Sequence, residues 1–254
     1  MKKALQEYKP LNDNIQTQIK PYIKYEDDSY YLGEWQINSE KRHGRGIQLW
    51  KNKSKYTGQW KDDKPNGFGK YESKNGDYYI GEWIDGKANG KGKFVNSNGS
   101  LYEGEWKNDK QNGEGQEIWP DGSEYKGSYE NGAKNGFGEF KWGNGSIYVG
   151  NFVNNDINGK GKYIFEDKRV YEGMWANNKM NGFGRFKWPD GRVFEGEYVN
   201  DKKDGFGIFN WPDGRIYKGN WKEGKQHGEG DYFNPKKKEW KKGLWEYGKR
   251  IKWI

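Results

Sequence analysis

The chain has 254 residues, a formal net charge of +8 and no cysteine, with 32% charged residues. So polar a composition is typical of disordered chains, but aromatic residues reach 18%, and disordered chains are poor in them. The lack of cysteine excludes disulfides, thiolate zinc sites and thiol nucleophiles.

The positive charge lies mainly at the two ends of the chain. Residues 1–24 carry +3 and residues 234–254 carry +6, whereas the stretch between them carries −1. Nucleic-acid-binding proteins usually have a continuous basic stripe, so we expect no nucleic-acid partner. The polar start and the lack of a run of about 18 apolar residues predict a cytoplasmic protein.

Residues 1–24 form a predicted N-terminal arm, in which Pro10 and Pro21 bracket a short helix or an extended segment. Residues 25–233 then repeat two aromatic residues around a glycine, and a Gly-x-Gly pattern follows each copy. Repeats of this length indicate a stacked array rather than a globular domain. From Tyr56 onward the spacing is 23 residues, and the nine repeats start near residues 31, 56, 79, 102, 125, 148, 171, 194 and 217.

Each repeat is predicted to be a β-hairpin. Rings or glycine alternate with charged residues in Tyr102–Lys107, which gives an aromatic face and a solvated face. Steps such as Asn66-Gly67 and Asp121-Gly122 are typical of tight turns. The predicted fold is all-β: an elongated single-sheet antiparallel β-solenoid of about nine stacked 23-residue hairpins.

The strand glycines are predicted to be structural. Glycine weakens a strand unless another group must lie close to its backbone. A Tyr or Trp ring that lies over the glycine of a neighbouring strand would supply that group. We assign this role to Gly81, Gly104, Gly127, Gly150, Gly173, Gly113, Gly115, Gly136 and Gly138.

The repeat that runs from Tyr102 through Trp106 and Gly113 to Asp121-Gly122 resembles the MORN (membrane occupation and recognition nexus) repeat. The resemblance covers about residues 25–233 and implies hairpins that stack into one twisted sheet. Members of the family often fuse the array to a catalytic domain or a membrane helix. The short flanking segments here resemble stand-alone arrays of the radial-spoke head and of other axonemal or cortical cytoskeletal proteins.

The sequence predicts no enzyme, no cofactor and no metal site. The Gly-x-Gly pairs lack the Gly-Lys-Ser/Thr continuation of a phosphate loop. His43 and His227 occupy a slot where other repeats have Asn, which indicates turn residues. Glu103 and Glu105 share the solvated face, where an open sheet offers no pocket to shift their pKa values.

The aromatic face is the first predicted binding surface. A single sheet cannot hide 14 Trp, 19 Tyr and 12 Phe from water, and large apolar surfaces usually mark binding sites. We expect the anchor rings to be mainly structural and a groove along their face to accept a partner helix or extended segment. The residues assigned to this face are Tyr102, Trp106, Tyr125, Tyr129, Tyr148, Phe152, Tyr171 and Trp175.

Residues 234–254, a degenerate repeat with a basic and aromatic cap, form the second predicted surface. A solvated cap, an acidic protein surface such as tubulin, or anionic lipid would each account for this composition. Open edge strands at both termini also suit self-association. The docking residues are Lys236, Lys237, Lys238, Trp240, Lys241, Lys242, Trp245 and Arg250.

These patterns favour a non-catalytic scaffold that binds partner proteins in a ciliary axonemal complex, such as a radial spoke or the central apparatus, or in a cortical cytoskeletal complex. The expected location is the cytoplasm, in the axoneme of a cilium or flagellum or in the cytoskeleton. The alternative is a peripheral membrane adaptor for anionic phospholipids such as phosphoinositides, which the nearly neutral repeat region disfavours.

Overall fold

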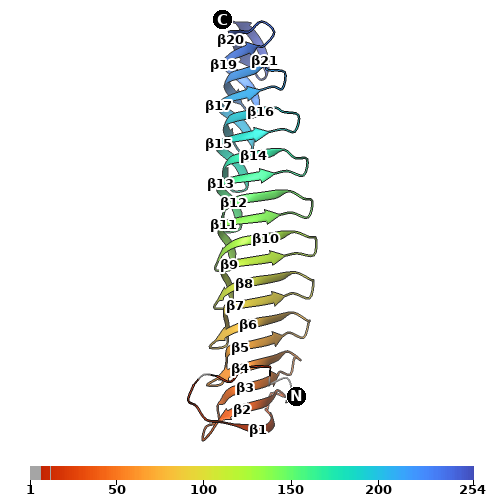
Figure 1. Ribbon diagram of the computed structural model, residues 1–254, viewed down its shortest axis with the longest axis vertical. Helices are drawn as coiled ribbons and strands as arrows, with labels where there is room; N and C mark the ends of the chain where they lie inside the picture. The colour runs from red at the N-terminus through yellow and green to blue at the C-terminus, as the bar shows by residue number, and fades with distance from the viewer. Residues whose placement is uncertain (1–6, 12) are drawn as a thin grey trace. The chain divides into compact units, whose positions relative to one another are not determined.

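The computed structural model describes residues 7–11 and 13–254, and this part of the chain contains β-strands and turns but no helix (Figure 1). The chain divides into two compact units: unit 1, Met1–Ala133, and unit 2, Lys134–Ile254. Unit 1 holds 21 basic and 21 acidic residues, and unit 2 holds 24 and 16. The whole net charge of +8 therefore belongs to unit 2.

Unit 1 is an antiparallel sheet in which each strand pairs with the next strand along the chain (Figure 1). The last eight residues of the predicted N-terminal arm form the first strand, and the described residues before it include a turn and bends. The strands are β1 (Thr17–Lys24), β2 (Tyr30–Gln36), β3 (Arg42–Leu49), β4 (Lys55–Lys61), β5 (Lys64–Glu72), β6 (Tyr78–Ile84), β7 (Lys87–Val95), β8 (Leu101–Lys107), β9 (Lys110–Ile118) and β10 (Glu124–Glu130).

Unit 2 has the same consecutive antiparallel pairing, which extends into the predicted C-terminal cap. The predicted all-β hairpin architecture is thus confirmed within each unit. The strands are β11 (Ala133–Lys141), β12 (Ile147–Val153), β13 (Asp156–Ile164), β14 (Val170–Ala176), β15 (Lys179–Lys187), β16 (Val193–Val199), β17 (Lys202–Asn210), β18 (Ile216–Lys222), β19 (Lys225–Asn234), β20 (Glu239–Glu246) and β21 (Lys249–Trp253).

The structure corrects the position of one of the two predicted turns. Between β4 and β5 the chain turns at Asp62 and Asp63, whose φ angles are 48° and 69°. Two successive residues with positive φ make the type I′ turn that fits the twist of a hairpin, and Asp and Asn tolerate this conformation. The predicted Asn66-Gly67 turn lies inside β5 instead. Gly67, with φ of 84°, accompanies a bulge in the register between Gly58 and Trp60.

The strand glycines leave room for the tyrosine rings of their own hairpins. A Cβ atom on Gly173 would lie 2.5 Å from the Cα of Gly184 and 2.6 Å from the Tyr171 hydroxyl, too close for any side chain. Gly81, Gly104, Gly115 and Gly150 are crowded in the same way by a tyrosine of their own hairpin. Gly127 and Gly138 lie opposite Gly115 and Gly150 in the ladder, and Gly113 and Gly136 have positive φ.

Candidate partner-binding surface

The two aromatic residues of each Tyr-x-Gly-x-Trp pattern form what we call the anchor row. Tyr171 shows the arrangement: its hydroxyl donates a hydrogen bond to the Met174 carbonyl at 2.9 Å. Its ring meets Trp175 edge to face at 5.0 Å and Tyr198 of the next repeat at 5.3 Å. Edge-to-face pairs stabilise beyond their buried area, so the anchor row both fills and links the hairpins.

Tryptophans of the anchor row also bond to the preceding repeat. The Trp83 Nε1–H donates to the Gly69 carbonyl at 3.0 Å, and Trp106 makes the same bond to Gly92 at 3.1 Å. A side chain at Gly69 or Gly92 would collide with the tyrosine ring of its own hairpin, Tyr56 or Tyr79. The glycines, the rings and the bonds between repeats therefore form one packing unit.

Seven of the eight rings predicted to contact a partner are buried in this core. Tyr102, Tyr125, Tyr129, Tyr148, Phe152, Tyr171 and Trp175 are at most 6% exposed, and Trp106 is half-buried. Burial raises the pKa of the Tyr148 hydroxyl to about 12. Since buried rings cannot touch a partner in this conformation, the contact surface must be sought among other rings of the same face.

A second aromatic series in unit 2, which we call the outer row, supplies such rings. It lies at the second and fourth positions after each Gly-x-Gly pair, and consecutive centroids are 4.4 to 6.4 Å apart. Phe186 and Phe209 are buried, whereas the other members are half-buried. The outer row consists of Phe140, Trp142, Tyr163, Phe165, Phe186, Trp188, Phe209, Trp211 and Tyr232.

Arginines and aspartates of the adjoining turns lie along the outer row at the 23-residue spacing. Arg192 lies 5.3 Å over the Trp188 ring, and its Nε is 2.7 Å from the Asp190 carboxylate. Arg215 repeats both contacts with Trp211 and Asp213. Each guanidinium is therefore neutralised within its own turn while it covers part of a ring.

Lys203 is the exception among these cations. Its amine lies 4.7 to 5.0 Å from four ring centroids, those of Trp188, Phe194, Phe209 and Trp221. Among the residues that the structure describes, no side chain or carbonyl gives this amine an ion pair or hydrogen bond. Burial, and then the nearby Arg192 charge, lower the pKa of Lys203 to about 8.

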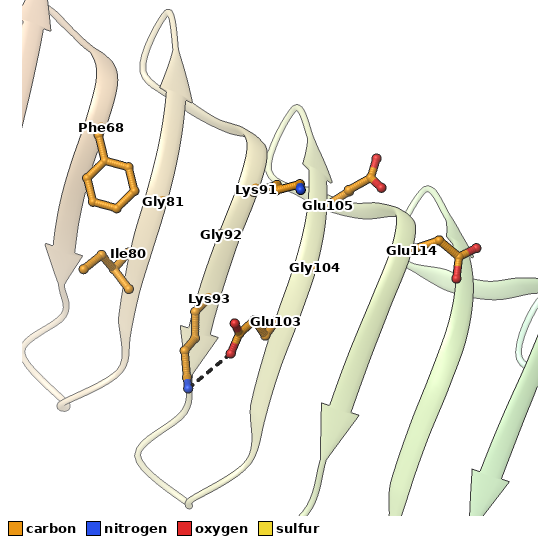
Figure 2. A pocket seen from close by; sticks show the side chains of 10 residues that line it. All are labelled: Phe68, Ile80, Gly81, Lys91, Gly92, Lys93, Glu103, Gly104, Glu105 and Glu114. Atoms are coloured by element: carbon orange, nitrogen blue, oxygen red, sulfur yellow. Dashed lines mark ion pairs between the residues drawn. The ribbon is translucent and has the colours of Figure 1, made fainter.

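The opposite face of unit 1 mixes charged and apolar side chains, because Phe68 and Ile80 lie there beside lysines and glutamates (Figure 2). An open hollow of about 450 Å³ lies over Gly81, Gly92 and Gly104. Lys93 and Glu103 face each other there at 3.3 Å. No group of three or more His, Asp or Glu residues suited to a metal occurs in the described ranges. Likewise, none of the described chain forms a helix of the length and apolarity needed to cross a bilayer.

The predicted docking tail continues the sheet as β20 and β21. Trp245 is buried and ends the anchor row, 5.0 Å from Tyr217. Lys241 and Lys242 pair with Glu239 and Glu229 at 3.5 and 2.6 Å, and Arg250 lies 4.2 Å over Trp253. Of the predicted docking residues, Lys236, Lys237 and Lys238 are exposed and form no ion pair within the described part of the chain, and Trp240 is exposed beside Phe233, at 5.2 Å between ring centroids. The docking role of the segment stays a prediction.

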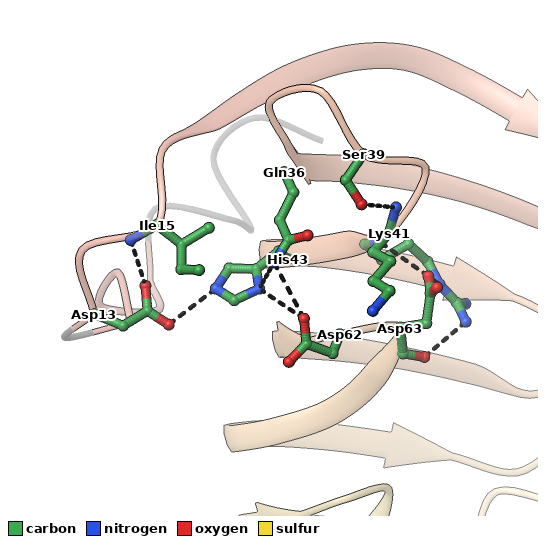
Figure 3. A network of polar contacts seen from close by, with 9 residues as sticks. Asp13, Ile15, Gln36, Ser39, Lys41, His43, Asp62 and Asp63 are labelled. Atoms are coloured by element: carbon green, nitrogen blue, oxygen red, sulfur yellow. Dashed lines mark hydrogen bonds and ion pairs between the residues drawn. The ribbon is translucent and has the colours of Figure 1, made fainter.

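His43 occupies a buried polar contact that sequence reasoning missed (Figure 3). It lies in β3 rather than in a turn, it is 1% exposed, and its Nε2 is 2.9 Å from Asp13. Gln36 lies 3.4 Å from its other ring nitrogen. These contacts attach residues before β1 to the first repeat. The signal for this contact in the sequence was that His replaces the Asn that other repeats have at the same position.

Comparisons with solved structures give weak likenesses. The TCP domain of SAS-4 from Drosophila melanogaster, in complex with a proline-rich motif of Ana2, has 14% identity and a TM-score of 0.37, with 61% of this chain and 85% of that chain covered. A mutant TCP10 domain of Danio rerio CPAP has 10% identity and a TM-score of 0.31, with 92% and 99% covered. Likenesses at this level carry no argument about function. No curated protein matches the chain.

The family comparison is specific. The MORN repeat model matches nine segments: residues 41–55, 56–78, 79–101, 102–124, 125–147, 148–168, 171–191, 194–214 and 217–236. These segments contain the anchor row, the crowded glycines and the turns described above. This chain belongs to the MORN repeat family.

Proposed function

We propose that this protein is a non-catalytic scaffold that binds partner proteins through the outer row of unit 2. The observation that carries the proposal is the stack of half-buried rings, which extends over four repeats. Contiguous apolar surface on a repeat protein is typical of a binding site. The rigid anchor row beneath it holds the surface in shape without a partner.

We place the scaffold in a ciliary axonemal complex or in the cortical cytoskeleton. The charge of unit 2, which suits acidic protein surfaces, supports this location. The alternative is an anionic membrane. One observation favours it: Trp240 is 51% exposed close to the exposed Lys236–Lys238 run, a composition typical of membrane interfaces.

The test is retention of the tagged protein in detergent-extracted flagellated cells. We expect the wild-type chain to stay with the axoneme or cortex, and the Trp188→Ala/Trp211→Ala variant to be lost to the soluble fraction. The matched control, Glu172→Ala/Glu195→Ala, changes two exposed residues of the same unit and should be retained. A soluble wild-type protein would overturn the location. Equal retention of all three variants would overturn the outer row as the contact. Binding to phosphoinositide vesicles that depends on Lys236–Lys238 would favour the alternative.

A further inference from the structure

The spacing of the outer row selects among the backbone conformations that a bound segment can have. Trp142, Phe165, Trp188 and Trp211 recur every 23 residues, that is, every two strands. Neighbouring strands lie about 4.8 Å apart, so equivalent rings repeat about every 9.6 Å. A segment that lies along the row must present equivalent side chains at the same interval to contact each ring alike.

Polyproline II fits this interval best. It has three residues per turn and a rise of about 3.1 Å, so every third side chain returns to the same side after about 9.3 Å. A β-strand returns a side chain to one side every second residue, after about 6.7 or 13 Å. Seven residues of an α-helix rise about 10.5 Å, which drifts from the rings by about 1 Å per repeat. Grooves lined with aromatic rings are also the usual binding sites of proline-rich segments.

Lys203 favours a bound segment that carries a negative charge. Its half-buried amine lies where the outer row meets the anchor row, between Trp188 and Trp221. The two acidic residues beside it in the sequence are engaged elsewhere. Asp201 accepts the backbone N–H of Met180 at 2.8 Å, and Asp204 accepts that of Glu223 at 3.1 Å.

In the first repeat, a cation at the position equivalent to Lys203 pairs with a carboxylate of the same chain. Arg42 holds the equivalent position and lies 4.3 Å over the Trp60 ring. Its Nε pairs at 3.1 Å with Asp63, whose backbone N–H donates to the Arg42 carbonyl. Gly224 makes the same backbone bond to Lys203, at 2.8 Å, but has no carboxylate. Gly224 therefore lies beside Lys203 at the position where the first repeat has Asp63 beside Arg42.

We propose that unit 2 binds an acidic polyproline-II segment of a partner protein along the outer row, with a carboxylate of the partner on the Lys203 amine. The partner's proline rings lie on the outer row, one for each repeat. Its carboxylate takes the place that Asp63 takes beside Arg42. The proposal rests on the scaffold function and names the chemistry of the partner.

The experiment titrates the purified full-length chain with three synthetic peptides and follows tryptophan fluorescence. The first is an oligoproline of about twelve residues, enough for four repeats at three residues each, with one central glutamate. The second has glutamine at that position. The third is an alanine-based helical peptide with the same central glutamate. We expect the glutamate oligoproline to bind about tenfold more tightly than either of the others, as for a partly buried charge-assisted contact.

Two variants locate the preference at Lys203. Lys203→Met should remove the tenfold difference between glutamate and glutamine. Gly224→Asp should remove it by a different route, because the new carboxylate copies Asp63. A Cβ at Gly224 meets no atom within 4 Å, and its φ of 85° is close to the 69° of Asp63. Gly224→Asp should also raise the pKa of the Lys203 amine, which NMR can follow.

Four outcomes would overturn the inference: no binding of either oligoproline, tighter binding of the helical peptide, equal binding of glutamate and glutamine peptides, or a preference that survives both substitutions. The extraction experiment separates this failure from failure of the scaffold function. If retention depends on Trp188 and Trp211 but oligoprolines do not bind, the scaffold function stands and the partner chemistry proposed here is wrong.

Discussion

Units 1 and 2 each contain an anchor row but differ in what lies beside it. In unit 2 the second and fourth positions after each Gly-x-Gly pair are both aromatic in four successive repeats, which makes the outer row continuous. In unit 1 polar residues interrupt the same positions, and Trp50 has one ring neighbour there, Tyr71 at 5.9 Å. The charge differs in the same sense, neutral in unit 1 and +8 in unit 2.

The difference separates the part of the repeat that folds from the part that binds. Tyr, Gly and Trp recur in both units because each contacts a neighbouring repeat, so a change at one damages two hairpins. The outer positions can be polar without loss of the sheet, as unit 1 shows. Rings placed there in unit 2 therefore point to a role beyond folding.

The largest expected effect falls equally on both units. Gly104→Val in unit 1 and Gly173→Val in unit 2 each place side-chain atoms within 2.6 Å of backbone. Because backbone cannot move aside, each should lower the free energy of unfolding by upwards of about 4 kcal/mol in urea melts. Glu172→Ala, an exposed neighbour, should change it by less than about 0.5 kcal/mol. A mild effect in either unit would show that the anchor row is not common to both.

Replacement of the ring at the second position after a Gly-x-Gly pair should lower the free energy of unfolding more in unit 2 than in unit 1. Phe209 is buried and has three ring neighbours, at 4.5, 5.7 and 5.9 Å, so Phe209→Ala should cost about 3 kcal/mol. Phe94 in unit 1 is half-buried with one such neighbour, Trp106 at 6.4 Å, and Phe94→Ala should cost about half as much. Equal losses in urea melts would mean that the outer row adds nothing to unit 2.

Alkaline pH should affect both units through their tyrosines and unit 2 also through Lys203. Burial raises the pKa of Tyr79 in unit 1 well above its usual range and that of Tyr148 and Tyr217 in unit 2 to about 12, whereas an unfolded tyrosine titrates near 10. Below pH 10 both states are protonated and the stability is intact. Above pH 10 the unfolded state alone loses protons, so stability falls. Phenolate absorbance should therefore appear late, together with unfolding.

The Lys203 contribution has the opposite sign. Its pKa of about 8 lies below the ordinary 10.5, so between these values the unfolded state holds more protons and stability rises with pH. Wild-type protein should gain stability between pH 8 and 10 relative to Lys203→Met, as measured by urea melts at several pH values. A constant difference across this window would contradict the burial of the charge.

The smallest expected effect compares two hydroxyls of the anchor row. Tyr171→Phe removes a hydrogen bond and should cost about 1 kcal/mol. The buried Tyr198 hydroxyl has no hydrogen-bond partner among the described residues, so Tyr198→Phe should be neutral or slightly stabilising. A matched loss in both variants would show that Tyr198 bonds to something in solution.

Much of this architecture was predictable because its causes are local or strictly periodic. Alternation of rings with charge predicted the two faces, and the shared spacing of ring and glycine predicted a contact between neighbouring strands of the kind that Gly184 and Tyr171 make. The turn at Asp62-Asp63 was harder to place, because a positive φ is equally acceptable to the neighbouring Asn66-Gly67 step. Hairpin register, set by pairing along both strands, decides between them.

By itself the sequence determined the repeat, the hairpins, the family and the aromatic face, since each depends on residue types at a fixed period. Tertiary structure alone decided which rings of that face are buried, because this depends on how one repeat covers the next. It also paired His43 with Asp13 across 30 residues, and it placed Gly224 where Lys203 would have needed a carboxylate. Such contacts join residues from different repeats, and periodicity says nothing about the single positions at which the repeats differ.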